Sequence, residues 1–96
     1  MREFRISKKA AFDIREISRY TTLEFGDQQA SRYKKGMYGV FQNLADSPDL
    51  GRDTTALIPR SKRYNYKAHS IFYMTTDTGI FIFRVLGQKQ DFGRHL

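Results

Sequence analysis

The side chains in this sequence that are best suited to chemistry are two histidines, His69 and His95, in a chain rich in lysine and arginine. Cleavage of RNA through its 2′-hydroxyl needs a base, an acid and cationic groups on the phosphate, and these residue types provide all three. Each histidine also has an ordinary interpretation: His69 precedes an apolar stretch where a structural hydrogen bond is common, and His95 is the penultimate residue. We therefore assign no catalytic residue.

Arg84 lies within the apolar stretch 80–86. A guanidinium among aliphatic side chains needs a carboxylate, a phosphate or carbonyl oxygens as its partner. An internal ion pair with Asp91 or Asp77 would satisfy it, and so would an acidic group of a second molecule. Both interpretations remain open.

The stretch 80–86 is apolar on both faces of an extended strand. Phe81, Phe83 and Val85 are expected to point one way. The residues expected on the other face are Ile80, Ile82, Arg84 and Leu86. A strand covered on one side only should alternate apolar and polar residues. Either the tail 87–96 folds back over the second face or a partner covers it, and the polar character of the tail favours the partner.

The segment 60–67 mixes cations with aromatic rings. Its members are Arg60, Lys62, Arg63, Tyr64, Tyr66 and Lys67. Such a mixture suits single-stranded nucleic acid, because the charges hold phosphates and the rings stack on bases. It equally suits the solvated face of an edge strand, where charges discourage aggregation, and this second interpretation is preferred.

Composition limits the remaining classes of function. The chain has 96 residues, no cysteine and a net charge of +7. We expect one domain, 1–96, with acidic partners and without disulfides or cysteine-based zinc sites. The charged amino terminus and the lack of a long apolar run favour a cytoplasmic protein with no membrane partner. No glycine-rich phosphate loop or metal-binding motif occurs, so we expect no metal and no other cofactor.

Periodicity predicts the elements that position these side chains. A strand at 2–6 is followed by a helix from Lys8 that Ser7 caps and Gly26 ends, and by a second helix at 28–45. After a loop at 49–62, strands are expected at 63–68, 70–75 and 79–86. The order β-α-α-β-β-β predicts a two-layer α+β fold, with a helical hairpin on a small antiparallel sheet.

Both helices show a face that should be buried. The residues of these two faces are Ala10, Ile14, Ile17, Thr21 and Phe25 in the first helix, and Ala30, Tyr33, Met37, Val40, Phe41 and Leu44 in the second. Phe12 and Leu23 lie opposite the first of these faces, as a small apolar patch that could serve assembly or nothing.

The chain resembles the ParE branch of the RelE/ParE toxin superfamily over nearly its whole length. The residues that carry the resemblance are Ala10, Asp13, Ile14, Ile17, Tyr20, Gly26, Gln29, Ala30, Tyr33, Phe41, Leu44, Ala45, Pro48, Gly51, Arg52, the run 69–73, Gly79, Ile80, Ile82, Arg84, Val85, Leu86, Asp91, His95 and Leu96. Gly87 and Gln90 stand where the closing pattern of that family usually has histidine and methionine.

The resemblance implies a toxin of a type II toxin–antitoxin module that inhibits DNA gyrase by binding and is neutralised by a ParD-like antitoxin. One alternative is a ribosome-dependent mRNA endonuclease of RelE type, with Arg84 on the phosphate, Lys62 or Lys89 assisting and His95 moving protons. A third is a non-toxic, basic nucleic-acid-binding module. The candidate residues for binding the antitoxin or the target are Arg60, Lys62, Arg63, Ile80, Ile82, Arg84, Leu86, Lys89, Asp91 and His95.

Overall fold

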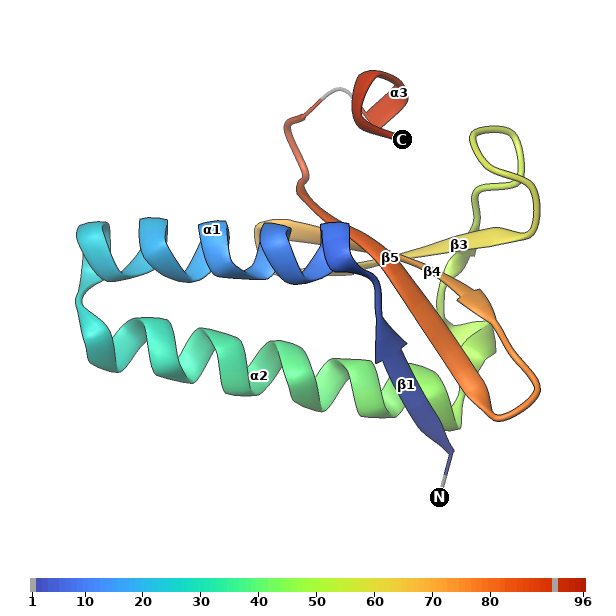
Figure 1. Cartoon of the computed structure of the whole chain (residues 1–96), viewed down its shortest axis with the longest axis horizontal. Coiled ribbons are helices and arrows are strands. Elements are labelled where there is room, and N and C mark those ends of the chain that lie inside the picture. The colour runs from blue at the N-terminus through green and yellow to red at the C-terminus, as the bar shows by residue number, and fades with distance from the viewer. Residues whose placement is uncertain (1, 91) are drawn as a thin grey trace.

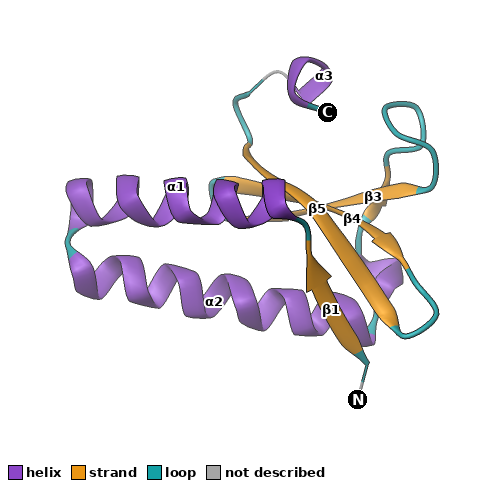
Figure 2. Ribbon diagram, viewed as in Figure 1, coloured by secondary structure: helices purple, strands orange, loops and turns teal. Residues whose placement is uncertain are grey.

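Two long antiparallel helices pack across one face of a five-stranded sheet (Figures 1 and 2). The computed structural model describes residues 2–90 and 92–96. Its elements are β1 (Glu3–Ile6), α1 (Lys8–Phe25), α2 (Asp27–Asp46), the 3-10 turn η1 (Pro48–Leu50), β2 (Arg52–Asp53), β3 (Ser61–Tyr66), β4 (His69–Thr75), β5 (Gly79–Gly87) and α3 (Phe92–His95). The predicted α+β class and the helical hairpin on a sheet are confirmed.

The sheet is mixed, although an antiparallel sheet was expected. Its strand order is β1-β5-β4-β3-β2, and β1 runs parallel to β5 while the other neighbours are antiparallel. Gly79 permits the parallel pairing, because a Cβ atom at this position would lie 1.7 Å from the backbone oxygen of Glu3. The segment 49–62, expected to be a loop, contributes η1 and the two-residue strand β2.

The ends of the helices follow local sequence signals. The Ser7 hydroxyl accepts a hydrogen bond from the Ala10 N–H at 3.0 Å and donates one to the carbonyl oxygen of Phe83, also at 3.0 Å. Gly26 separates the helices with a φ of 89°, in the region that favours glycine. Gly26 also occupies the cap position of α2, and Asp27 is the first residue of that helix. The hydrogen bond from Ser7 to Phe83 holds the start of α1 against β5.

The core lies between the helices and the inner part of the sheet. Its buried residues are Ala10, Ile14, Met37, Phe41, Leu44, Ala45, Ile71, Tyr73, Ile80, Ile82 and Val85. Both helices extend beyond the sheet toward their connection (Figure 1). Phe25, placed by periodicity on the buried face of α1, is therefore 66% exposed, because no strand lies under the end of the hairpin.

A register shift in β5 changes which side chains share a face. Ile82 pairs with Tyr73 and Arg84 pairs with Phe72, so Phe83 is an extra residue without a partner in β4. Strict alternation placed Val85 opposite Ile80 and Ile82, but all three lie in the core beneath the helices. The expectation failed because a bulge inverts the alternation beyond it. Within the described residues, no helix has the length and apolar character needed to cross a membrane.

Candidate functional site

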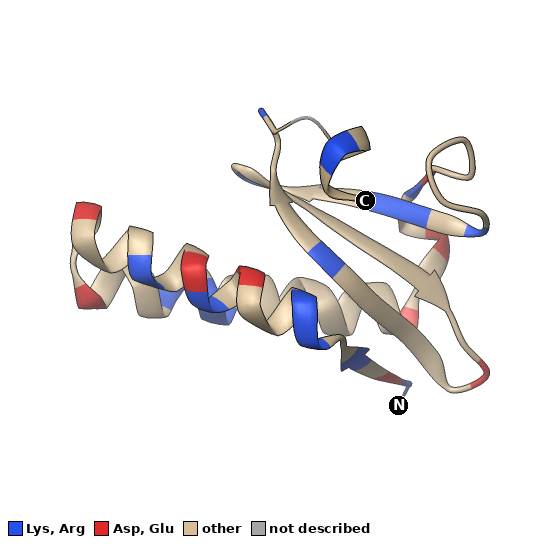
Figure 3. Ribbon diagram, turned by 45° about the horizontal axis from the view of Figure 1, so that its top comes forward, with Lys and Arg blue, Asp and Glu red and all other residues tan. Residues whose placement is uncertain are grey.

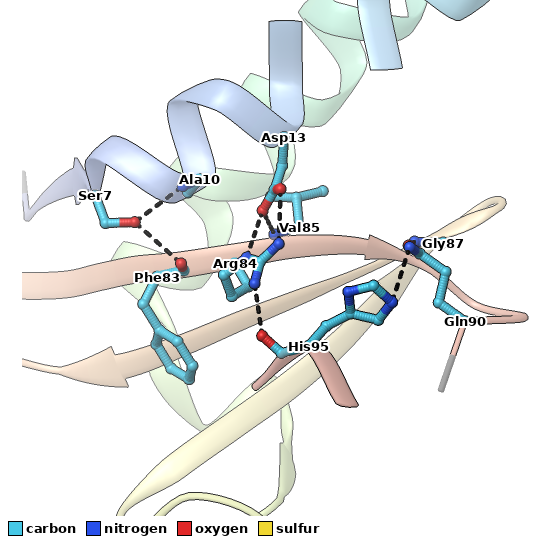
Figure 4. A network of polar contacts seen from close by, with 9 residues as sticks. All are labelled: Ser7, Ala10, Asp13, Phe83, Arg84, Val85, Gly87, Gln90 and His95. Atoms are coloured by element: carbon cyan, nitrogen blue, oxygen red, sulfur yellow. Dashed lines mark hydrogen bonds and ion pairs between the residues drawn. The ribbon is translucent and has the colours of Figure 1, made fainter. Parts of the chain in front are cut away.

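Arg84 joins the start of α1, the bulged part of β5 and the C-terminal segment. Its Nε donates to Oδ2 of Asp13 at 2.8 Å, and its Nη2 donates to Oδ1 of Asp13 at 2.9 Å (Figure 4). The backbone N–H of Val85 also donates to Oδ2 of Asp13, at 3.0 Å, and Nη1 of Arg84 donates to the carbonyl oxygen of His95 at 2.6 Å. One carboxylate thus accepts three hydrogen bonds across the α1–β5 junction.

Among the described residues, the expected internal partner of Arg84 exists, and it is Asp13 rather than Asp77. Asp91 lies outside the described residues. The hydrogen bonds from Arg84 to Asp13 raise the pKa of the guanidinium. The two side chains are 16% and 8% exposed, so this charge is already neutralised in a largely buried place. Asp13 could have been identified from the sequence, because it is an acidic residue next to Ile14 on the face of α1 that was expected to be buried.

The tail folds back over the second face of the sheet. The Phe92 ring lies 5.0 Å from the Phe72 ring in an edge-on arrangement, and the Arg63 guanidinium lies 5.4 Å from the centre of the Phe92 ring. Gln90 Oε1 accepts a hydrogen bond from the Gly87 N–H at 2.5 Å. Phe72 is fully buried. At Phe72 the tail therefore covers this face of the sheet, which was the less favoured of the two expectations.

Two open grooves are lined by Arg84 together with His95 of the tail. One, of about 330 Å³, is lined by Lys8, Lys9, Phe83 and the terminal Leu96, among others. The second, of about 710 Å³, runs between the outer side of α1 and the end of β5. Residues lining this second groove include Phe12, Glu16, Tyr20, His69, Leu86 and Gln90. Both grooves combine apolar walls with polar edges, which is typical of surfaces that receive a peptide or a side chain.

Positive charge gathers around these grooves. Lysine and arginine occur on the first turn of α1, in β5, in β3 and on α3 (Figure 3). The first turn of α1 contains no acidic residue, so the positive end of the helix dipole adds to the charges of Lys8 and Lys9. An acidic ligand with apolar side chains would be complementary to this region.

His69 has a structural role. Its Nδ1 lies 2.7 Å from the Tyr33 hydroxyl, joining β4 to α2, and burial lowers the pKa of the imidazole. Burial likewise raises the pKa of Tyr33. A neutral imidazole hydrogen-bonded to a tyrosine hydroxyl is suited to holding two elements together, as the position of His69 before an apolar strand indicated.

The other candidates identified from the sequence do not form one cluster. Arg60 and Lys89 are exposed, and Lys62 and Arg63 are half-buried on opposite faces of β3. The side chain of His95 is exposed and its ring lies 3.5 Å from Gln90 Nε2.

Three apolar candidates are enclosed by the chain itself. Ile80, Ile82 and Leu86 are 1%, 0% and 3% exposed. Their assignment to a partner surface is corrected, because side chains already packed within the chain offer no free area.

The cations and rings of 60–67 are also divided between different environments. Tyr64 and Tyr66 pack against the core, and the Lys67 ammonium lies 5.4 Å from the centre of the Tyr66 ring. Rings held in this way are not free to stack on bases. Within the described residues, no group of three or more potential metal ligands is found.

Comparison with known proteins is consistent over the whole chain. Residues 4–92 match the family model described as ParE toxin of type II toxin-antitoxin system, parDE. The chain is 27% identical to Toxin ParE1 of Caulobacter vibrioides, over all of this chain and 99% of that protein. The fold is also similar to a solved chain of the chromosomal ParDE system from P. aeruginosa, with a TM-score of 0.76 and 17% identity over 91% of this chain and 96% of the other.

Proposed function

Because the chain belongs to the ParE family of toxins from type II toxin–antitoxin systems, we propose that it inhibits DNA gyrase by binding and that a ParD-like antitoxin neutralises it. Membership of this family implies that the chain has an antitoxin as a partner. What we propose beyond this is that the target is gyrase and that the antitoxin is ParD-like.

The state of Arg84 supports inhibition by binding over cleavage of a message. In the endonuclease alternative, this guanidinium would have to hold the scissile phosphate. Here Nε and Nη2 of Arg84 bind the Asp13 carboxylate, and Nη1 binds the His95 carbonyl oxygen. A phosphate would compete with a well-formed bidentate ion pair whose negative charge also repels it. Arg84 is therefore better suited to stabilising the fold than to binding a scissile phosphate.

Of the two grooves, the smaller one beside Arg84 is the proposed antitoxin surface. The groove of about 330 Å³ has Phe83 on its wall and Lys8 and Lys9 at its edge. An extended or helical antitoxin segment with acidic residues beside aliphatic ones would bury the apolar wall and pair with the lysines. The exposed tail cations, Lys89 and Arg94, are the proposed contacts to gyrase or its DNA.

The target is tested with purified chain in gyrase supercoiling and cleavage reactions. We expect loss of supercoiling and accumulation of linear DNA as the chain is added, and recovery when the cognate antitoxin follows. A Lys89→Glu/Arg94→Glu variant should need at least about tenfold more protein for half inhibition. The Arg32→Glu/Lys35→Glu variant, with the same change of charge on the exposed side of α2, is its matched control.

The antitoxin surface is tested by calorimetry with a second matched pair. Lys8→Glu/Lys9→Glu should weaken antitoxin binding about tenfold or more, and Lys34→Glu/Lys35→Glu, an adjacent lysine pair on α2, should leave it nearly unchanged. Equal losses for both variants would reject this placement of the antitoxin. Arg84 is unsuitable as a probe, because its replacement would also disrupt the fold.

Other outcomes identify the other functions. Normal supercoiling together with site-specific cleavage of a defined message on translating ribosomes would support the RelE-type endonuclease. No effect on gyrase and no cleavage of the message, together with DNA binding that weakens as salt is added, would support the basic nucleic-acid-binding module.

A further inference from the structure

The outward side of α1 carries four exposed residues in a 4-3-4 spacing. They are Phe12, Glu16, Arg19 and Leu23. Phe12 and Leu23 are 53% and 78% exposed, and the side chains of Glu16 and Arg19 are 48% and 74% exposed. Residues at this spacing form a stripe along one face of a helix, as the contact positions of coiled coils do. The stripe lies opposite the buried face of α1 and takes no part in the core.

The order of chemistry along this stripe is apolar, acidic, basic, apolar. Reading it from the other end gives apolar, basic, acidic, apolar, so every position meets a complementary one when two copies are aligned antiparallel. Phe12 then faces Leu23 of the other copy, and Glu16 faces Arg19. We propose that a second copy of this chain docks here, through a two-fold, antiparallel α1–α1 contact.

Charge decides the orientation. In a parallel alignment, Glu16 would face Glu16 and Arg19 would face Arg19, and like charges at the centre of an interface oppose association. In the antiparallel alignment both central layers are acid–base pairs, and the outer two layers are apolar. The pattern therefore favours a single register and a closed dimer rather than an open chain of molecules.

The stripe is accessible in the folded chain. Figure 1 shows α2 along one side of α1, and no other described element lies on the opposite side along the second half of α1. Among the described residues, Glu16 and Arg19 make only a long contact with each other, of 3.8 Å, and the Arg15 guanidinium lies 6.0 Å from the centre of the Phe12 ring. Neither contact removes the four side chains from solvent, so a partner helix can still bury them.

The size of the contact sets its strength. The stripe spans about 17 Å, or about three turns of helix. Interfaces that bury less than about 1,200 Å² are weak and transient, and a contact along one helix falls in that class. The net charge of +7 on each chain adds long-range repulsion. The dissociation constant of the dimer should therefore lie in the micromolar range, and the fraction of chains in the dimer should rise with protein concentration.

Sedimentation equilibrium of the purified full chain over a concentration series tests the dimer. Glu16→Arg alone and Arg19→Glu alone place like charges in both central layers, so each should raise the dissociation constant about tenfold or more. An equimolar mixture of these two variants should form a mixed dimer with about the wild-type dissociation constant. The double variant Glu16→Arg/Arg19→Glu should also recover it, because acid again faces base.

These variants separate the contact from a general effect of charge. Arg32→Glu on α2 changes the net charge as Arg19→Glu does, and it should leave the dissociation constant nearly unchanged. A wild-type chain that stays monomeric at the highest concentration would overturn the proposal. So would failure of the double variant and of the mixture to restore the dimer. Gyrase inhibition is measured separately, so neither result depends on the proposed toxin activity.

Discussion

Helix α1 takes part in two acid–base pairs, whose acids Asp13 and Glu16 lie about one turn apart and whose surroundings are opposite. On the inner side, Asp13 accepts two hydrogen bonds from Arg84, and the side chains are 8% and 16% exposed. On the outer side, Glu16 and Arg19 approach to 3.8 Å with 48% and 74% of their side chains exposed. The same chemistry thus belongs to the fold on one side and to the surface on the other.

The difference shows how burial changes what an ion pair does. Breaking a buried pair leaves a charge without water or a partner, which is costly, whereas an exposed pair contributes little because water replaces either partner. The inner pair is also joined to the Val85 N–H and the His95 carbonyl oxygen, so it holds three segments. Among the described residues, the charged groups of the outer pair contact only each other, so this pair is available to a second molecule.

Removal of the inner acid should have the largest effect. Asp13→Ala leaves Nε and Nη2 of Arg84 and the Val85 N–H without their acceptor. We expect the free energy of unfolding to fall by about 3 kcal/mol or more, as for other buried pairs that lose one partner. Urea denaturation followed by circular dichroism measures it. Glu16→Ala is the control, and similar losses for both would erase the contrast between the two sides.

A change that keeps the charge should give a smaller effect of the same kind. Arg84→Lys retains a cation but replaces the two parallel N–H bonds to Asp13 with a single ammonium. A loss of about 1 to 2 kcal/mol in the free energy of unfolding is expected, whereas Arg19→Lys should be neutral. Were Arg84→Lys as stable as the wild type, charge alone would account for the inner pair.

Two glycines extend the contrast to α2. A Cβ atom at Gly36 would lie 2.0 Å from the Tyr66 hydroxyl, and at Gly39 it would meet nothing within 4 Å. Gly39→Ala should therefore stabilise the chain by about 1 kcal/mol through helix propensity. Gly36→Ala should lower stability by about 1 kcal/mol, because Tyr66 must move away from Tyr33. Thermal unfolding compares them, and changes of equal sign would contradict the assignment of the two faces.

The smallest expected effect concerns the dependence of stability on pH. Burial lowers the pKa of His69 below the value of 6.5 that it has when exposed. Between these two values the unfolded chain binds more protons than the folded chain, so the free energy of unfolding falls as the pH falls through that range. Denaturation at pH 7.5 and pH 5 should show this loss, and His69→Gln should reduce it. An unchanged difference in the variant would place the titration elsewhere.

Local patterns predicted the elements well, and the reason lies in short-range physics. Ser7, the helical stripes and Gly26 act within one or two turns, so the start of α1 and the hairpin are readable from neighbouring residues. The limit of this reading is visible at Phe25, where the stripe continues but the sheet beneath it has ended. Periodicity describes the face of a helix and does not tell how far its neighbour extends.

The candidate site was less predictable, because its contacts join distant residues. That Arg84 needs an acidic or carbonyl partner followed from its apolar surroundings, but Asp13 is 71 positions away. The tail was expected to leave the sheet open because it is polar as a whole. A single ring, Phe92, proved sufficient to cover Phe72.

What the sequence determined by itself was the class of the fold, the two helices and the need of Arg84 for an oxygen partner, because periodicity, capping and desolvation act through residue type and close neighbours. Only the tertiary structure decided which acid Arg84 binds and which way Val85 points. Both outcomes depend on the bulge in β5 and on the parallel pairing of β1 with β5, two strands that lie far apart along the chain. Packing selects among arrangements that local preferences leave equal in energy.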